Sequence, residues 1–243
     1  MSNNPLADRI ALVTGASRGI GHHTAVALAR EGAHVIALAR TVGGLEDLDD
    51  AIREEGGSAT LVPLDLKDSE ALDRLGESIL GRWGRLDILV ANAGILGTPT
   101  PLHQLKPETF DDVFAVNVTA NFRLIRALQA PLQQAEAPQA LFVSSGAARS
   151  KRPFVGTYAA SKAALEALVV SWAKEHANTP LKANLFTPGV VATRMRGQYA
   201  PGEDQSKLTQ PRDVGAEIAR LLAEGMTETG RLYDFDHKHW LDV

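Results

Sequence analysis

A glycine-rich turn near the N-terminus constrains the fold of this chain more than any other feature. Gly15, Gly19 and Gly21 separate an apolar run at residues 10–13, typical of a buried strand, from a helical pattern over residues 20–30. Glycines let the backbone turn sharply and approach a ligand, and the helix that follows points free N–H groups at the same place. The turn therefore predicts a pyrophosphate site. Its Gly-x-x-x-Gly-x-Gly spacing differs from the usual dinucleotide fingerprint, so a glycine-rich connection without a ligand stays an alternative.

Strand and helix patterns alternate along the rest of the chain. Further short apolar runs occupy residues 33–39, 59–64, 88–90, 139–143, 181–186 and 231–235. Long helical patterns cover residues 110–134 and 157–176, whereas residues 194–210 are polar and loop-like. Such alternation is typical of a parallel sheet with helices on both faces. Because no repeat or linker interrupts it, we expect residues 1–243 to form a single α/β Rossmann domain with a doubly wound, seven-stranded parallel sheet.

The composition excludes several classes of protein. The 243 residues carry a net charge of −4 with acids and bases interspersed, which argues against a nucleic-acid partner. Without cysteine there are no disulfides, thiol nucleophiles or cysteine-bound metals. No apolar run is long enough to span a membrane, and residues 1–9 do not resemble a signal peptide, so we expect a cytoplasmic protein. The histidine pairs at 22–23 and 237/239 lack further ligands nearby, and we expect no metal.

Two arginines indicate which dinucleotide would bind. A fold that prefers NAD usually has an acid after the second strand, to bond the ribose 2′-hydroxyl. Here Arg40 stands at that point, and Arg18 lies inside the glycine turn. Two guanidinium groups suit a 2′-phosphate, so the pair favours NADP over NAD. Asp65, at the end of the third strand, could accept from the adenine amino group or simply form a turn before the next helix.

A second group of residues carries the candidate chemistry. Tyr158 and Lys162 are four residues apart in a helical pattern and so share a face. A nearby ammonium would lower the tyrosine pKa from its usual value of about 10 and make a workable acid/base. Ser145, at the end of the fifth strand, could bond the substrate carbonyl, with Ser144 as the competing hydroxyl. Asn117 lies in an apolar helix, where it either makes a structural hydrogen bond or holds a water beside Lys162.

With these motifs in view, the chain resembles the short-chain dehydrogenase/reductase family over nearly its full length, and in particular its NADP-preferring bacterial members. Besides the residues above, Asn92-Ala93-Gly94, Pro188-Gly189 and Thr193 match the family pattern. The C-terminus departs from it, because residues 237–240 read His-Lys-His-Trp where many relatives carry a glycine pair.

The resemblance implies a role for each matching residue. Tyr158 would be the acid/base, Ser145 would orient the substrate oxygen, and Asn117 would support a water of the proton relay. Lys162 would lower the Tyr158 pKa and bond the nicotinamide ribose. Asn92 and Gly94 would line the adenosine side, and Thr193 would meet the carboxamide. The residues expected to contact the cofactor are Gly15, Ser17, Arg18, Gly19, Ile20, Gly21, Arg40, Asp65, Leu66, Asn92, Ala93, Gly94, Tyr158, Lys162, Pro188, Gly189, Val191 and Thr193.

These observations predict an NADP-dependent oxidoreductase that moves a hydride between nicotinamide C4 and a carbonyl or alcohol substrate. A catalytically idle NADP-binding regulatory or scaffold protein is one alternative, and a lyase or isomerase on the same fold is another. Helices 110–134 and 157–176 look apolar on more than one face, and relatives commonly pair through them. We therefore expect a homodimer or homotetramer, with no nucleic-acid or membrane partner.

The substrate end is expected near the C-terminal half of the chain. Leu96, Phe154, Val155 and the segment 190–207 would line it, and residues 194–210 would act as a lid. Its basic side chains could either meet an anionic group of the substrate or remain solvated; they are Lys151, Arg152, Arg194 and Arg196.

Overall fold

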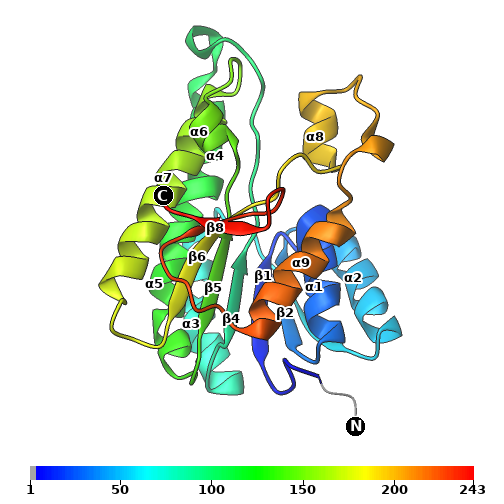
Figure 1. The fold of residues 1–243 in the computed structure, drawn as a ribbon, viewed down its shortest axis with the longest axis vertical. Helices are drawn as coiled ribbons and strands as arrows, with labels where there is room; N and C mark the ends of the chain where they lie inside the picture. Colours follow the sequence, from blue (N-terminus) through cyan, green and yellow to red (C-terminus); the bar gives the residue numbers. More distant parts are fainter. Residues whose placement is uncertain (1–3) are drawn as a thin grey trace.

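One twisted sheet runs through the middle of the computed structural model, which describes residues 4–243 (Figure 1). Its strand order in that part of the chain is β3-β2-β1-β4-β5-β6-β7-β8. The strands are β1 (Ile10–Thr14), β2 (His34–Ala39), β3 (Ser58–Pro63), β4 (Ile88–Ala91), β5 (Gln139–Val143), β6 (Lys182–Thr187), β7 (Leu232–Asp234) and β8 (His239–Leu241). The first seven are parallel, as predicted, but β8 pairs antiparallel with β7. The sheet therefore has eight strands rather than the expected seven.

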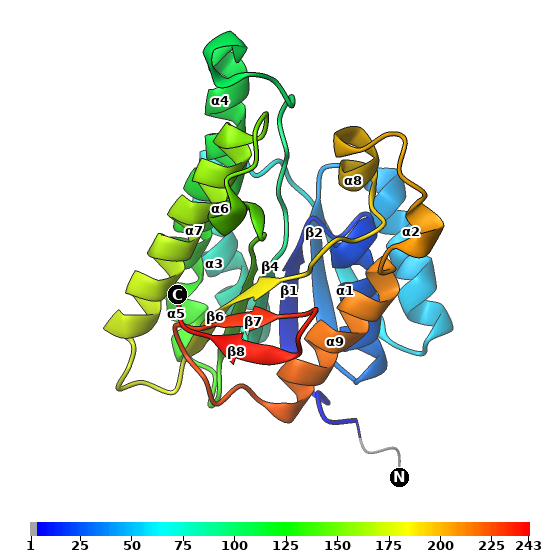
Figure 2. The same cartoon turned by 45° about the horizontal axis from the view of Figure 1, so that its top comes forward.

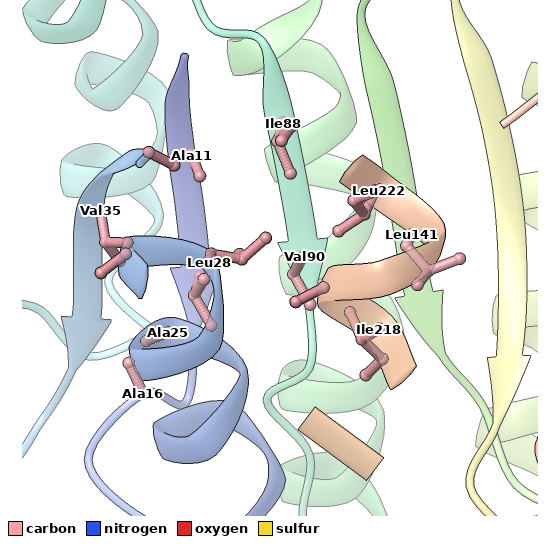
Figure 3. Packing of buried hydrophobic residues seen from close by; sticks show 14 of the residues in the cluster. Ala11, Ala16, Ala25, Leu28, Val35, Ile88, Val90, Leu141, Ile218 and Leu222 are labelled. Atoms are coloured by element: carbon pink, nitrogen blue, oxygen red, sulfur yellow. The ribbon is translucent and has the colours of Figure 1, made fainter. Parts of the chain in front are cut away.

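Helices cover both faces of this sheet (Figures 1 and 2). The principal helices are α1 (Gly19–Arg30), α2 (Val42–Glu54), α3 (Ser69–Trp83), α4 (Pro107–Phe114), α5 (Ala120–Gln133), α7 (Gly156–Glu175) and α9 (Pro211–Glu224). The side chains of β1 show why two layers are needed. Ala11 and Val13 pack into the core beneath α1, α2 and α9, whereas Ile10 and Leu12 point to the core beneath α3, α5 and α7. Figure 3 shows the first core, with Leu28 and Ile218 converging on the sheet.

The strand order places the ligand site. The chain winds from β1 outward to β3, then crosses back to place β4 on the other side of β1. At such a reversal the connections after β1 and β4 lead away in opposite directions and leave a crevice beyond the carboxyl ends of the strands. The glycine turn follows β1, so the fold sets it at the edge of this crevice.

Two segments differ from the predicted elements. The helix expected over residues 110–134 is divided into α4 and α5 by a turn of π-helix, η2 (Ala115–Thr119), which contains Asn117. Such turns replace the usual hydrogen-bond ladder locally and often accompany functional sites. The segment 194–210, expected to be a loop, contains α8 (Arg194–Tyr199) and a 3₁₀ turn, η3 (Gln205–Lys207). Thr193 caps α8 by accepting from the N–H of Arg196.

Within residues 4–243, no helix is long and apolar enough to cross a membrane.

Close packing of α3 against α5 gives a prediction about stability. A Cβ added to Gly76 would lie 1.8 Å from the carbonyl oxygen of Ala127, whereas one added to Gly81, on the same helix, would meet nothing within 4 Å. Gly76→Ala should therefore lower the free energy of unfolding by about 1–3 kcal/mol, because α5 must move away. Gly81→Ala should raise it by about 0.5–1 kcal/mol through helix propensity alone. Urea unfolding of both variants checks this, and a Gly76→Ala protein as stable as the wild type would contradict the packing.

Candidate functional site

A cleft of about 1110 Å³ opens beyond the carboxyl ends of the parallel strands. It brings together nearly all of the residues that the sequence singles out. Those that line it are Gly15, Ser17, Arg18, Gly19, Ile20, Arg40, Asp65, Leu66, Asn92, Ala93, Gly94, Ser145, Tyr158, Lys162, Pro188, Gly189, Val191 and Thr193. Gly21 and Asn117 are not among the residues that line the cleft.

The glycine turn is locked to the end of β4. The hydroxyl of Thr14 accepts from the N–H groups of Asn92 and Ala93, both at 3.1 Å, and the Asn92 amide donates to the Thr14 carbonyl at 3.0 Å. A Cβ on Gly21 would lie 2.5 Å from that amide nitrogen. Asn92 thus supports the turn, while Gly21 allows the close approach. Gly19 instead has a φ of +59°, and a Cβ added there would contact Thr193 at an ordinary 3.7 Å. Gly19 and Ile20, at the start of α1, line the cleft.

Arg18 and Arg40 line the same cleft, as the cofactor hypothesis requires. Arg40 directly follows β2, and its guanidinium lies 3.9 Å from the carboxylate of Asp65, both side chains being largely exposed. Such a pair is weak. Asp65 also accepts from the N–H of Lys67 at 2.9 Å, so it forms the turn that was weighed as the alternative to adenine binding. The two guanidinium groups remain accessible to a phosphate.

Helix α7 and the end of β5 bring the candidate catalytic side chains together. Tyr158 and Lys162 follow one another on the same face of α7, and the Lys162 Nζ lies 5.9 Å from the centre of the Tyr158 ring. That Nζ donates to the carbonyl oxygen of Val143, the last residue of β5, at 2.7 Å. Ser145 lies two residues farther on and lines the same cleft as Tyr158.

Burial shifts the pKa of both residues against the charged form. It raises the pKa of Tyr158 above its ordinary value, and the neighbouring Ser145 side chain opposes this only in part. It lowers the pKa of Lys162 to about 8, against an opposing contribution from Glu166. The lowered tyrosine pKa expected from the sequence is therefore wrong for this structure, because desolvation of the buried phenol outweighs the lowering effect of Ser145.

The two neighbouring serines have different environments. Ser144 is buried, and its hydroxyl donates to a carboxylate oxygen of Glu166 at 2.5 Å. Ser145 is half-buried, and its hydroxyl accepts from the N–H of Ala147 at 3.2 Å. Its remaining capacity to donate is the reason that Ser145, rather than Ser144, can serve a ligand in the cleft.

Asn117 is fully buried, and its side chain is bonded to backbone and side-chain groups of the protein. Its amide accepts from the N–H of Ile95 and donates to the Ile95 carbonyl, each at 2.9 Å, and also donates to the hydroxyl of Ser161 at 2.9 Å. Its own carbonyl, in the π turn, accepts from Asn121. The side chain therefore makes the structural hydrogen bonds weighed as one alternative, and it fastens the loop after Gly94 to α7.

The substrate end is only partly as expected. Leu96 and Val155 line the cleft, but Phe154 instead lines a small neighbouring pocket. Of the four bases, Lys151 does not line the cleft, whereas the other three do, and Arg196 forms an ion pair with Glu203. Met195, Gln198 and Tyr199 of the segment 190–207 line the cleft as expected, whereas sequence reasoning missed other lining residues, among them Arg149, Ser150, Asp234, Asp236 and Leu241.

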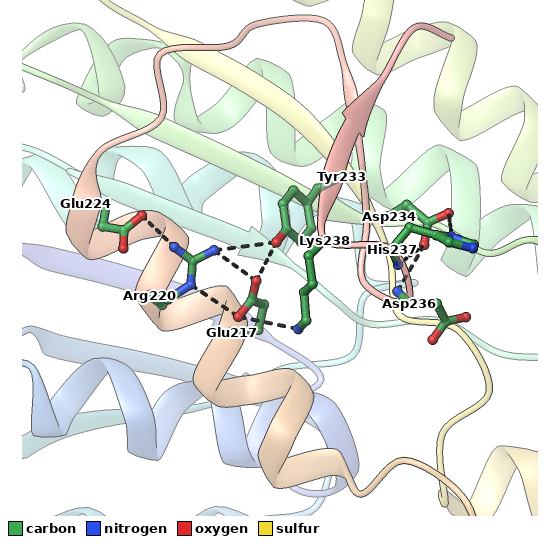
Figure 4. A network of polar contacts seen from close by, with 8 residues as sticks. All are labelled: Glu217, Arg220, Glu224, Tyr233, Asp234, Asp236, His237 and Lys238. Carbon is green, nitrogen blue, oxygen red and sulfur yellow. Dashed lines mark hydrogen bonds and ion pairs between the residues drawn. The ribbon is translucent and has the colours of Figure 1, made fainter.

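The atypical C-terminus forms the hairpin β7–β8, which carries Asp234 and Asp236 to the cleft. Polar contacts hold this hairpin on α9 (Figure 4). Glu217 accepts from Arg220 and Tyr233 and pairs with Lys238. Burial opposes ionisation of Glu217, but these contacts outweigh it and lower its pKa to about 2. His237 pairs with Asp234 at 3.1 Å, and no cluster of metal ligands occurs among residues 4–243.

The chemistry of this cleft fits a phosphorylated dinucleotide. It combines an open glycine turn at the N-terminus of α1 with accessible guanidinium groups at one end, and a buried ammonium beside a phenol at the other.

Comparison with known proteins agrees with this geometry. A family model described as short chain dehydrogenase matches residues 9–204. The chain belongs to the short-chain dehydrogenase/reductase family. It is 37% identical over 233 residues to the uncharacterized oxidoreductase YciK of Escherichia coli K12, covering 94% of this chain and 92% of that protein. The chain is thus an oxidoreductase of this family, with the Rossmann-like fold.

Solved structures of relatives show the same fold. A short chain dehydrogenase from Shigella flexneri, complexed with NADP, superposes with a TM-score of 0.91 at 37% identity, covering 97% of this chain and all (100%) of that one. Another, from Escherichia coli CFT073, is complexed with NADPH and superposes with a TM-score of 0.89 at 37% identity, covering 97% and 99%.

Proposed function

We propose that this protein is an NADP-dependent oxidoreductase that interconverts a carbonyl compound and the corresponding alcohol, with Tyr158 as general acid and base. The observation that carries the proposal is the convergence of Ser145, Tyr158 and Lys162 on the cleft that also contains the glycine turn. A protein that only binds NADP, as a regulator or scaffold, has no need of this second group. A lyase or isomerase would use the same tyrosine without net oxidation or reduction.

The bound cofactor would supply or accept the hydride at C4 of its nicotinamide. In the direction of reduction, the hydride goes to the carbonyl carbon and Tyr158 gives its proton to the oxygen, which yields the alcohol. The raised pKa of Tyr158 keeps the phenol protonated and ready to donate. The hydroxyl of Ser145 can hydrogen bond the reacting oxygen, and the positive charge of Lys162 stabilises the phenolate left behind.

The arginines support the choice of cofactor. Arg18 and Arg40 would hold the 2′-phosphate, while the N–H groups of the turn around Gly19 would hold the pyrophosphate. The complexes of the Shigella and Escherichia relatives with NADP and NADPH agree with this choice. The other predicted contacts, from Asn92 through Thr193, would position the adenosine and the nicotinamide along the cleft.

Removal of the Tyr158 hydroxyl tests the reaction. We expect Tyr158→Phe to lose at least about 10²-fold in turnover, because no other group in the cleft takes over the proton transfer. NADPH binding should persist. Tyr233→Phe makes the same chemical change outside the cleft and should keep its turnover.

The measurement is NADPH oxidation across a panel of aldehydes and ketones, with NADPH binding followed by fluorescence. Wild-type protein that binds NADPH but oxidises it with no carbonyl compound would favour the scaffold alternative. Product formed without net cofactor oxidation would favour the lyase or isomerase.

Reversal of the charge at the end of β2 tests the cofactor. We expect Arg40→Asp to weaken NADPH binding about tenfold or more, because a charge-assisted bond to the 2′-phosphate is replaced by repulsion. NADH binding should improve, since the acid can accept from the ribose 2′-hydroxyl. Arg74→Asp, on the exposed face of α3, should leave both dissociation constants unchanged. An unchanged NADPH-to-NADH preference in Arg40→Asp would contradict the assignment of this site.

We also propose that the protein forms a homodimer or homotetramer through the α4–α5 and α7 region. Large apolar side chains on these first two helices, Phe110 and Phe122, are exposed to 41% and 45%. Exposed aromatic patches commonly mark interfaces. Sedimentation velocity should show a dimer or larger assembly, and Phe122→Glu should shift it toward the monomer. A wild-type protein that stays monomeric at high micromolar concentration would refute this.

A further inference from the structure

A buried carboxylate lies one helical turn from the candidate catalytic lysine on α7 and has no part in the mechanism described above. Glu166 follows Lys162 by one helical turn on α7 and is only 6% exposed. Carboxylates are rarely buried to this extent unless they are paired and hydrogen bonded, so its place in the core needs a reason.

Glu166 joins α7 to the segment that follows β5. One carboxylate oxygen accepts from the Ser144 hydroxyl at 2.5 Å, and the other accepts from the guanidinium of Arg149 at 2.8 Å. Arg149 belongs to the short helix α6 (Ala147–Ser150) and lines the cleft. Ser145, which lines the cleft with Tyr158, lies between these two attachment points in the sequence.

Lys162 needs such a neighbour because its ammonium is almost completely buried, at 3% exposure. From β5 it receives only a neutral acceptor, the Val143 carbonyl. The π turn presents the amide of Asn117, and α7 itself presents the phenol of Tyr158. Glu166, one turn farther along α7, is a carboxylate whose charge favours the protonated lysine, and it is also paired with Arg149.

We propose that Glu166 is a positioning residue that sustains the positive charge of Lys162 and, through Ser144 and Arg149, holds the Ser145 segment against α7. It acts through Lys162 and touches no reacting atom. The inference rests on the proposed function for its catalytic consequence. The effect of the carboxylate on Lys162 is a separate property that can be measured without any substrate.

The direct test is a titration of Lys162 in protein labelled with ¹³C at the lysine ε-carbon. The Lys162 signal is recognised by its loss in Lys162→Met and by its titration near pH 8, well below ordinary lysines. In Glu166→Gln the midpoint should fall by about one pH unit, the lower end of the range for loss of a close opposite charge. In Glu166→Asp, which keeps the negative charge, the Lys162 midpoint should stay close to its wild-type value.

Two controls separate the charge from a merely structural role. Ser144→Ala removes the hydrogen bond but keeps the carboxylate, and should leave the midpoint in place. Glu55→Gln removes a carboxylate from an exposed ion pair with Arg30 and should also leave it unchanged. A midpoint that is the same in Glu166→Gln as in the wild type, or that falls equally in Ser144→Ala, would overturn the proposal.

The same variants should show the consequence for the reaction. Above its pKa Lys162 loses the charge that stabilises the phenolate, so kcat/KM for carbonyl reduction should decline as pH rises through about 8. In Glu166→Gln this decline of kcat/KM at alkaline pH should begin about one pH unit lower, as the NMR midpoint of Lys162 does. If the wild type reduces no carbonyl compound, the proposed function fails while the titration still decides the role of Glu166. If Glu166→Gln shifts the NMR midpoint of Lys162 but leaves the pH dependence of kcat/KM unchanged, the catalytic part of the inference is refuted.

Discussion

A buried ammonium costs free energy unless acceptors surround it, and in this protein that requirement joins α7 to β5. The contact of Lys162 with the Val143 carbonyl fixes the helix against the carboxyl end of a central strand. Tyr158 lies one turn before this contact and Glu166 one turn after it. Their reach to Ser145 and Ser144 therefore follows from the same register between helix and strand. The chemistry of the site depends on this register more than on any single hydrogen bond within it.

A second connection fixes the other half of the cleft. The bonds between Thr14 and the Asn92–Ala93 backbone tie the glycine turn to the end of β4, across the point where the strand order reverses. Asn117 extends the connection, because it bonds the backbone of Ile95, three residues after Asn92, and also Ser161 on α7. Polar side chains thus link the turns after β1 and β4 to the helix that carries Tyr158. Hydrogen bonds within the protein thus fix the position of these turns relative to α7.

The parts of this arrangement that the sequence predicts are those encoded locally. Buried parallel strands are short continuous apolar runs, and all seven were found because each is bounded by turn residues. The glycine turn and the Tyr158–Lys162 pair were found because their spacing is fixed by the geometry of a turn and of a helix. β8 was missed because three residues, His239 to Leu241, carry no alternation and become a strand only by pairing with β7. The π turn was missed because the apolar pattern of residues 115–119 is that of an ordinary α-helix.

The pKa of Tyr158 illustrates a deeper limit of the sequence. The four-residue spacing of Tyr158 and Lys162 places an ammonium near the phenol, and this proximity alone predicts a lowered pKa for Tyr158. Desolvation has the opposite sign, and it depends on what α7, β5 and the π turn together exclude from the pocket, which no local pattern records. Glu166 could have been noticed as an acid one turn beyond Lys162, but its meaning depends on Ser144 and Arg149, which approach it only in the folded chain. The identity of the candidate catalytic residues is therefore predictable from local sequence, whereas their charge states depend on the fold.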